Sequence, residues 1–235
     1  MSTVGIIGAM DVEVEALKKD MKIHRIVSKA GMEFCEGVLC GQYVVVVRSG
    51  IGKVNAAVCT QILIDDFHAD TVINTGIAGS LKAEINIGDM VVSTDLVHHD
   101  MDARGFGYAL GQIPQMDVFS FESDEELAKL AQKACEEVNP EIQVFRGRIV
   151  SGDQFISDRD VKEKIAQNFD GYCTEMEGAS IAQTAHLNKV PFVVIRAISD
   201  KADDSATMDY PAFEKLAVEH SVRLVKKLME YVSAA

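Results

Sequence analysis

Two carboxylates flank a methionine in the stretch TEMEGASIAQTA, which covers residues 174–185. The acids are Glu175 and Glu177, and small residues with the apolar spacing of a helix follow them. Burying a carboxylate costs free energy unless a charge or a hydrogen-bond donor meets it. The pair therefore consists either of solvated acids at a helix start or of acids that line a site and could transfer protons there.

Further charged residues stand at other predicted strand ends. Taken alone, Glu13 is a helix-start acid favoured by the helix dipole, and Asp200 is an N-cap or loop acid. Arg196 lies within the apolar run FVVIRAIS, and an arginine is almost never buried without a partner. Its candidate partners are Glu13, Glu175 and Glu177. Carboxylates from three strand ends around one buried arginine predict an acid–base cluster.

Three other motifs do not predict a site. GIIGAM lacks the GxGxxG spacing of dinucleotide-binding proteins. In SGIGKVNAA the upstream glycine of a phosphate loop is missing, and Val54 stands where serine or threonine would bind magnesium. The adjacent His98 and His99 would point to opposite faces of a strand and would not easily share one ion. We therefore expect no metal ion and no cofactor.

Strands alternate with helices along the chain, and runs such as VVVV and FVVI predict strands buried on both faces. This order predicts an α/β fold with a mixed, mostly parallel central sheet flanked by helices, with ligands at the carboxyl ends of the strands. No linker, repeat or low-complexity tract divides the sequence, so residues 1–235 are expected to form a single domain. The predicted strands are 4–10, 23–30, 32–39, 42–48, 71–74, 89–97, 144–151, 172–174 and 191–198. The predicted helices are 11–21, 53–67, 125–138, 158–169, 177–187 and 211–232. A loop is predicted over 110–122.

Overall charge and cysteine content restrict the partners and the location. A net charge of -13 repels phosphate backbones and anionic lipids, so neither nucleic acid nor a membrane is an expected partner. The five cysteines are odd in number and form no CxxC motif, which is typical of reduced thiols in the cytoplasm. No apolar run is long enough to span a bilayer, and the first residues lack the basic region of a signal peptide. A cytoplasmic protein is expected.

The residues discussed above belong to segments that follow one another in this order: GIIGAMDVEVEAL, SGIGKVNAA, NTGIAGS, GDMVVS, FGYALGQIP, RGRIVSGDQFI, TEMEGASIA and VPFVVIRAISDKAD. The set resembles the bacterial 5′-methylthioadenosine/S-adenosylhomocysteine nucleosidases, a family of the nucleoside phosphorylase superfamily. The resemblance runs nearly end to end and is weakest at residues 18–36 and 122–141. It implies a nucleoside phosphorylase-like fold and a single nucleosidase domain. The implied reaction hydrolyses the N-glycosidic bond of 5′-methylthioadenosine and S-adenosylhomocysteine, and also of 5′-deoxyadenosine, to adenine and the 5-substituted ribose in methionine salvage.

The resemblance also implies roles for the charged residues. Hydrolysis of this bond needs an acid near the base and a water activator on the far face of the sugar, as in inverting glycoside hydrolysis. Asp200 would protonate adenine N7, and Glu13 would activate the water. Glu177 would bind the ribose hydroxyls, and its charge would favour the cationic sugar. Arg196 would pair with the acid cluster, and Glu175 would be its partner or hold the water network.

Neutral residues complete the implied substrate site. Phe155 would stack on adenine, and the backbone of Ile156 would bind the Watson–Crick edge. A homodimer is implied, in which Phe106 and Pro114 reach the pocket of the neighbouring subunit. The other substrate-binding residues are Met10, Ile51, Ala78, Gly79, Met176, Ser199 and Tyr210.

Two alternatives remain beside a hydrolase. A purine nucleoside phosphorylase on the same scaffold would need arginines or free backbone N–H groups for phosphate, whereas the first strand leads into the anionic segment Met-Asp-Val-Glu. A non-catalytic purine-binding protein would not need Glu13, Glu177 and Asp200 together. The preferred 5′-substituent is left open by the sequence.

Overall fold

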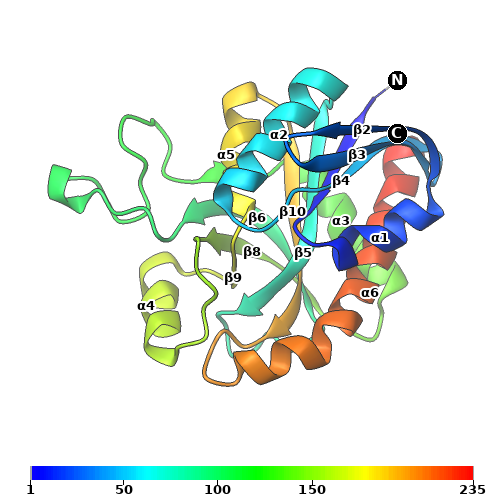
Figure 1. Ribbon diagram of the computed structural model, residues 1–235. Helices are drawn as coiled ribbons and strands as arrows, with labels where there is room; N and C mark the ends of the chain where they lie inside the picture. The colour runs from blue at the N-terminus through cyan, green and yellow to red at the C-terminus, as the bar shows by residue number, and fades with distance from the viewer. Residues whose placement is uncertain (1, 235) are drawn as a thin grey trace.

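Helices cover two faces of a mixed sheet in the computed structural model, which describes residues 2–234 (Figure 1). The helices are α1 (Asp11–Asp20), α2 (Lys53–Phe67), η1 (Arg104–Phe106), α3 (Glu125–Val138), α4 (Arg159–Phe169), α5 (Gly178–Asn188) and α6 (Ala206–Ala234). The strands are β1 (Val4–Gly8), β2 (Lys22–Lys29), β3 (Met32–Leu39), β4 (Gln42–Arg48), β5 (Thr71–Ser80), β6 (Met90–His98), β7 (Phe121–Glu122), β8 (Val144–Ser151), β9 (Cys173–Glu175) and β10 (Phe192–Asp200). One apolar core lies between the sheet and α2 with α5, and a second lies between the sheet and α1, α3 and α6.

The strands are joined in the order β10-β6-β8-β9-β5-β1-β4-β3-β2, with β7 paired to β6. Because β10 also pairs with β5, the strands β5, β10, β6, β8 and β9 close into a ring. The described residues contain five parallel and five antiparallel strand pairings. The mixed α/β fold is confirmed. Periodicity shows which residues are buried but not which strands are neighbours, so the sequence did not predict the closed ring.

Three parallel strands, β1, β5 and β10, direct their carboxyl ends to one edge of the sheet. Two predicted strand ends there are wrong. β5 continues to Ser80 instead of ending at 74, because the glycine-containing segment TGIAGS stays paired with β10 as far as Gly79. β10 likewise continues past 198, so Asp200 is the last strand residue rather than a loop or N-cap acid. Pairing with a neighbouring strand overrides the weak strand propensity of glycine here.

Two further predicted boundaries also need correction. The loop predicted over 110–122 ends in the short strand β7, because Phe121 pairs with Leu96 of β6. The last helix begins at Ala206 rather than at 211, and it accommodates Pro211 in its second turn. Residues 101–120, called the arm below, contain η1 and otherwise neither helix nor strand, and they project from the body on the left of Figure 1. Within residues 2–234, no helix is both long and apolar enough to cross a membrane.

Candidate active site

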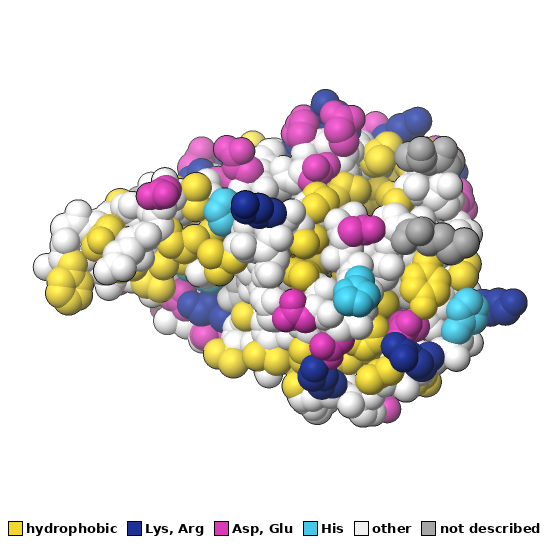
Figure 2. All heavy atoms as spheres, turned by 90° about the horizontal axis from the view of Figure 1, so that it is seen from above, with side chains coloured by type: hydrophobic (Ala, Val, Ile, Leu, Met, Phe, Trp, Pro, Cys, Tyr) yellow, Lys and Arg dark blue, Asp and Glu magenta, His cyan; other side chains and the backbone are white. Residues whose placement is uncertain are grey.

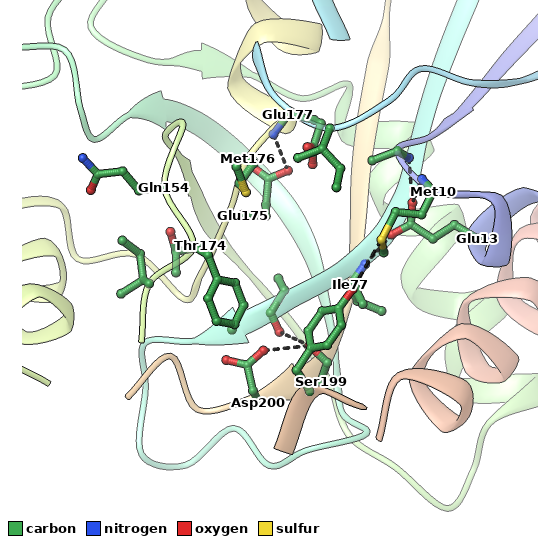
Figure 3. A pocket seen from close by; sticks show the side chains of 17 residues that line it. Met10, Glu13, Ile77, Gln154, Thr174, Glu175, Met176, Glu177, Ser199 and Asp200 are labelled. Carbon is green, nitrogen blue, oxygen red and sulfur yellow. Dashed lines mark hydrogen bonds between the residues drawn. The ribbon is translucent and has the colours of Figure 1, made fainter. Parts of the chain in front are cut away.

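A cavity of about 500 Å³ lies at the carboxyl ends of β1, β5 and β10 (Figure 3). Its walls include thirteen of the predicted site residues: Met10, Glu13, Ile51, Ala78, Gly79, Phe155, Ile156, Glu175, Met176, Glu177, Ser199, Asp200 and Tyr210. Four lining residues were missed by the sequence analysis: Ala9, Ile77, Gln154 and Thr174. Each of these four is the neighbour in sequence of a predicted residue, so widening each motif by one position would have found them.

The structure places Glu13 in the first turn of α1 with its carboxylate buried against backbone. Its Oε2 accepts hydrogen bonds from the N–H groups of Ala9 at 2.6 Å and Met10 at 2.9 Å, and its Oε1 accepts from Ile77 at 3.2 Å. A Cβ at Gly76 would come within 2.7 Å of Oε1, so a glycine is needed at this position of β5. Burial raises the pKa of Glu13, although Arg196 and the backbone donors partly offset the rise.

Arg196 lies behind the cavity wall and is only 1% exposed. It forms an ion pair with Glu175 and donates to Asn74 Oδ1 at 2.5 Å and to the carbonyl of Ile195 at 3.0 Å. The predicted need for a carboxylate partner is confirmed, and the partner is Glu175. Arg196 does not line the cavity itself, but it contacts an acid that does.

Glu175 is held as a charged residue. The hydroxyl of Ser151 and the N–H of Gly178 donate to its carboxylate, the second at 2.7 Å. Burial raises the pKa of Glu175, but Arg196 and these donors more than offset that rise and hold the pKa below its ordinary value. Burial in turn lowers the pKa of Arg196, and the surrounding glutamates raise it above its ordinary value.

Glu177 has different partners from Glu175, as expected for residues two apart. It is the N-cap residue of α5, and its Oε1 accepts a hydrogen bond from the N–H of Gly52 at 2.8 Å. Burial and then the charge of Glu175 raise the pKa of Glu177 to about 7. Glu177 can therefore exchange a proton near neutral pH, whereas Glu175 cannot.

Asp200 ends β10 on the other side of the cavity, beside Gly79 of β5. Its carboxylate accepts from the hydroxyl of Ser199 at 2.8 Å and from the N–H of Ala202 at 2.7 Å. A Cβ at Gly79 would lie 2.7 Å from Asp200 Oδ1, so the glycine makes room for the carboxyl group. Burial raises the pKa of Asp200, and the strongest charges acting on it are the acids Asp209 and Asp203.

An aromatic wall faces these acids. The rings of Phe155 and Tyr210 meet edge to face, with centroids 5.9 Å apart at 89°. Phe155 is 51% exposed, so much of its ring is free to contact a ligand. The hydroxyl of Tyr210 lies 3.3 Å from Met10 Sδ and donates to Glu214 at 3.1 Å. A flat, largely apolar ring carrying a hydroxylated sugar would match both walls of this cavity.

The two histidines of the motif His98-His99-Asp100, called the HHD motif below, lie in different surroundings. His98 Nε2 is 3.0 Å from Gln183 Oε1, whereas the ring of His99 packs against Gly152. Residues 2–234 contain no group of three or more His, Cys, Asp or Glu side chains that could hold a metal ion.

Besides Arg196, two predicted residues lie outside the cavity of their own chain. Phe106 and Pro114 are both on the arm, and neither lines the pocket. The side chain of Phe106 is 87% exposed. Figure 2 shows hydrophobic side chains along the arm, which extends to the left of the body. Within one chain, the arm therefore contributes nothing to this cavity.

Comparisons with known proteins agree on one group of relatives. The family model described as "Phosphorylase superfamily" matches residues 3–230. The chain is 41% identical over 228 residues to a 5′-methylthioadenosine/S-adenosylhomocysteine nucleosidase of Bacillus cereus (strain G9842), covering 97% of this chain and 98% of that protein.

Solved structures give the same result. The nucleosidase of that name from Neisseria meningitidis, in complex with methylthio-immucillin-A, superposes with a TM-score of 0.94 at 42% identity, covering 98% of this chain and 100% of that one. A futalosine hydrolase of Helicobacter pylori strain 26695 superposes with a TM-score of 0.92 at 33% identity, covering 98% of both chains.

Proposed function

The chain belongs to the phosphorylase superfamily and, within it, to the 5′-methylthioadenosine/S-adenosylhomocysteine nucleosidases, and we propose that it hydrolyses the N-glycosidic bond of these two nucleosides. The products are adenine and the 5-substituted ribose, as a step of methionine salvage. One observation carries the proposal: four carboxylates line the cavity, and none of the seventeen described residues in its walls is lysine, arginine or histidine. We also propose that residues 1–235 act as one nucleosidase domain, and that the five free thiols belong to a cytoplasmic protein.

Glu13 activates the attacking water in this proposal. Three backbone N–H groups fix its carboxylate, so its orientation does not depend on substrate. Burial raises its pKa, which makes it a stronger base than a solvated glutamate. The water that it orients attacks the anomeric carbon on the face of the sugar away from the base.

Glu177 binds the ribose hydroxyls, and Met176 packs against the sugar. Cleavage leaves positive charge on the ribose ring, and a carboxylate close by stabilises that charge. The pKa of Glu177 is about 7. The positive charge that develops on the ribose therefore favours the charged form of Glu177. Glu175, which is already paired with Arg196, provides a second negative charge in the cavity.

Asp200 donates a proton to N7 of the departing adenine. An acid must keep its proton until the bond breaks, and burial raises the pKa of Asp200 in the required direction. Ser199 and the N–H of Ala202 fix the orientation of the carboxyl group. Phe155 stacks on the base, the backbone of Ile156 binds its Watson–Crick edge, and Ala78 with Gly79 allows close approach.

Water is the second substrate rather than phosphate. Arg196 is the basic residue nearest the acid cluster, but it does not line the cavity, and its two terminal nitrogens already serve Glu175, Asn74 and Ile195. Glu13, Glu175 and Glu177 would repel a phosphate ion at the position where it would have to attack. A nucleoside phosphorylase is therefore disfavoured on electrostatic grounds.

Product analysis tests the reaction. Purified protein is incubated with 5′-methylthioadenosine in buffers with and without phosphate, and the products are separated by chromatography. We expect adenine and free methylthioribose at equal rates in both buffers. A sugar 1-phosphate formed only with phosphate would identify a phosphorylase, and the absence of adenine in both would refute a nucleosidase acting on this substrate. S-adenosylhomocysteine, 5′-deoxyadenosine and a futalosine-type nucleoside measured in parallel would rank the 5′-substituents.

A homodimer belongs to the same proposal. Apolar side chains are exposed on α2 and at the end of α5, among them Val54, Val58 and Leu187, and Figure 2 shows yellow patches on this face. Phe106 is also exposed, on the arm, and we propose that Phe106 and Pro114 complete the pocket of a second subunit. Sedimentation should give a dimer at assay concentration. A fully active monomer would contradict this arrangement.

A further inference from the structure

Three segments that are distant in the sequence meet beside the cavity. They are the start of α2 at Lys53, the residue Asp100 beyond β6, and the residue Asp153 beyond β8. Lys53 Nζ lies 2.6 Å from Asp100 Oδ1, and the N–H of Asp153 donates to Asp100 Oδ2 at 3.0 Å. The N–H of Lys53 donates to Asp153 Oδ1 at 2.9 Å, which closes the set. We call these three residues the clasp.

The clasp is more than a surface ion pair. The side chains of Lys53 and Asp100 are 21% and 18% exposed, so solvent screens their attraction only partly. Burial raises the pKa of Asp100, but Lys53 and the N–H of Asp153 more than offset this and hold the pKa below its ordinary value. Both carboxylate oxygens of Asp100 are therefore committed to donors on two other segments.

The clasp also supplies a cap that α2 lacks. The N-cap residue of α2 is Gly52, which has no side chain to accept the first helical N–H groups. Two carboxylates from elsewhere take that place: Asp153 accepts from Lys53, and Glu177 accepts from Gly52 at 2.8 Å. A Cβ at Gly52 would lie 3.2 Å from Asp153 Oδ1, so the glycine lets the acid approach. When Glu177 turns to a sugar hydroxyl, Asp153 remains as a negative charge at the helix start.

We propose that Lys53, Asp100 and Asp153 are positioning residues that set the distance between two walls of the cavity. Lys53 lies two residues after Ile51, and Asp153 lies two residues before Phe155; both of these neighbours line the cavity. Loss of the clasp would free the 152–156 segment to move away from the bound base. This role rests on the proposed nucleosidase function, and it gives the HHD motif a purpose other than metal binding, since Asp100 is its third residue.

Steady-state kinetics with 5′-methylthioadenosine test the clasp. Lys53→Met should lower kcat/KM by about 10–100-fold, mainly through a higher KM, because a small misplacement of a binding wall weakens substrate positioning. Lys53→Arg should recover part of the loss. Asp153→Ala should also raise KM, because the N–H of Lys53 loses its acceptor, and Asp153→Asn should recover part of that loss, because its amide oxygen still accepts this N–H although the negative charge is gone. Lys129→Met, which removes an exposed lysine of α3, is the matched control.

The split between KM and kcat separates positioning from folding. A merely structural role would reduce the active fraction and lower kcat while KM stayed at the wild-type value, and that result would overturn the proposal. A second measurement needs no substrate: amide hydrogen exchange at residues 152–156 should be faster in Lys53→Met than in Lys129→Met. Equal exchange rates would overturn the clasp even if the wild-type protein cleaved no nucleoside, so the two proposals fail separately.

Discussion

Two groups of acids lie along β10, one around Arg196 and one at Asp200, and different charges face them. Around Arg196, a guanidinium pairs with Glu175 and keeps its pKa low. Around Asp200, the strongest neighbouring charges are other acids, and the carboxyl pKa is raised. The same side-chain chemistry is thus shifted toward the charged carboxylate in one region and toward the protonated carboxyl group in the other. The pKa values of Glu13 and Glu177 are raised as well, because one arginine does not offset the burial of three acids.

The largest expected effect comes from removing the proton at the Asp200 end. Asp200→Asn should lower kcat by about 10²–10⁴-fold, because the amide cannot protonate the leaving base. Adenine should still bind, since Phe155 and Ile156 are unchanged. Turnover is measured by adenine release, and binding by calorimetry. Asp204→Asn, at an exposed position, is the matched control. If Asp200→Asn kept most of the wild-type turnover, the acid that protonates adenine would be another group.

Removing the cation should affect folding more than any change at Asp200. Arg196→Met should lower the free energy of unfolding by about 3–5 kcal/mol, because Glu175 would be left buried without its partner. Arg223→Met, which breaks an exposed pair with Glu141, should lower it by about 1 kcal/mol or less. Urea unfolding compares the two. Equal losses would mean that the Arg196 region is not held together by its charge.

The raised pKa of Glu177 should make the stability of the protein depend on pH. Below pH 4.5 the carboxyl group is protonated in both the folded and the unfolded chain. Between about pH 4.5 and 7 the unfolded chain releases this proton first, so the wild type loses stability as pH rises. A folded pKa of about 7 against 4.5 corresponds to about 3 kcal/mol by pH 8. Glu177→Gln should therefore gain stability over the wild type by that amount as pH rises.

Glu175→Gln is the control of opposite sign. The pKa of Glu175 in the folded chain is lowered, so this residue stabilises the wild type at neutral pH. That stabilisation is lost as pH falls below 4.5. The variant should be less stable than the wild type at pH 8, and the deficit should shrink in acid. If the two variants followed the same pH trend, the contrast between paired and unpaired acids would be wrong.

Most elements and most acids of the cavity could be predicted because their signals are local. Helix α2 has the predicted bounds, and so does α3, which begins after the capping acid Asp124. Acids at strand ends were found because parallel strands bring their carboxyl ends together. The choice of Glu175 among three partners for Arg196 depends on the pairing of both β9 and β10 with β5, which no single segment contains.

Long-range pairing explains what the sequence did not reveal. β5 is longer than predicted because its partner strand holds a glycine-rich segment extended. The clasp joins Lys53 to Asp100, 47 residues apart, and Asp100 to Asp153, 53 residues apart. Lysine and aspartate in turns look like ordinary surface residues in a sequence, since nothing local indicates their burial or their partner.

The smallest effect is expected at the aromatic wall, which belongs to neither acid group. Phe155→Leu keeps an apolar side chain but loses ring stacking, so binding should weaken by about 1 kcal/mol, close to a fivefold rise in KM. The pH dependence of kcat should not change, because Phe155 makes no hydrogen bond to Glu13, Glu177 or Asp200. Phe213→Leu, a half-exposed ring on α6 outside the cavity, controls for general loss of aromatic packing. A shifted pH profile in Phe155→Leu would show that the aromatic wall controls the desolvation of the acids. Base binding by the wall and proton transfer by the acids could then not be separated.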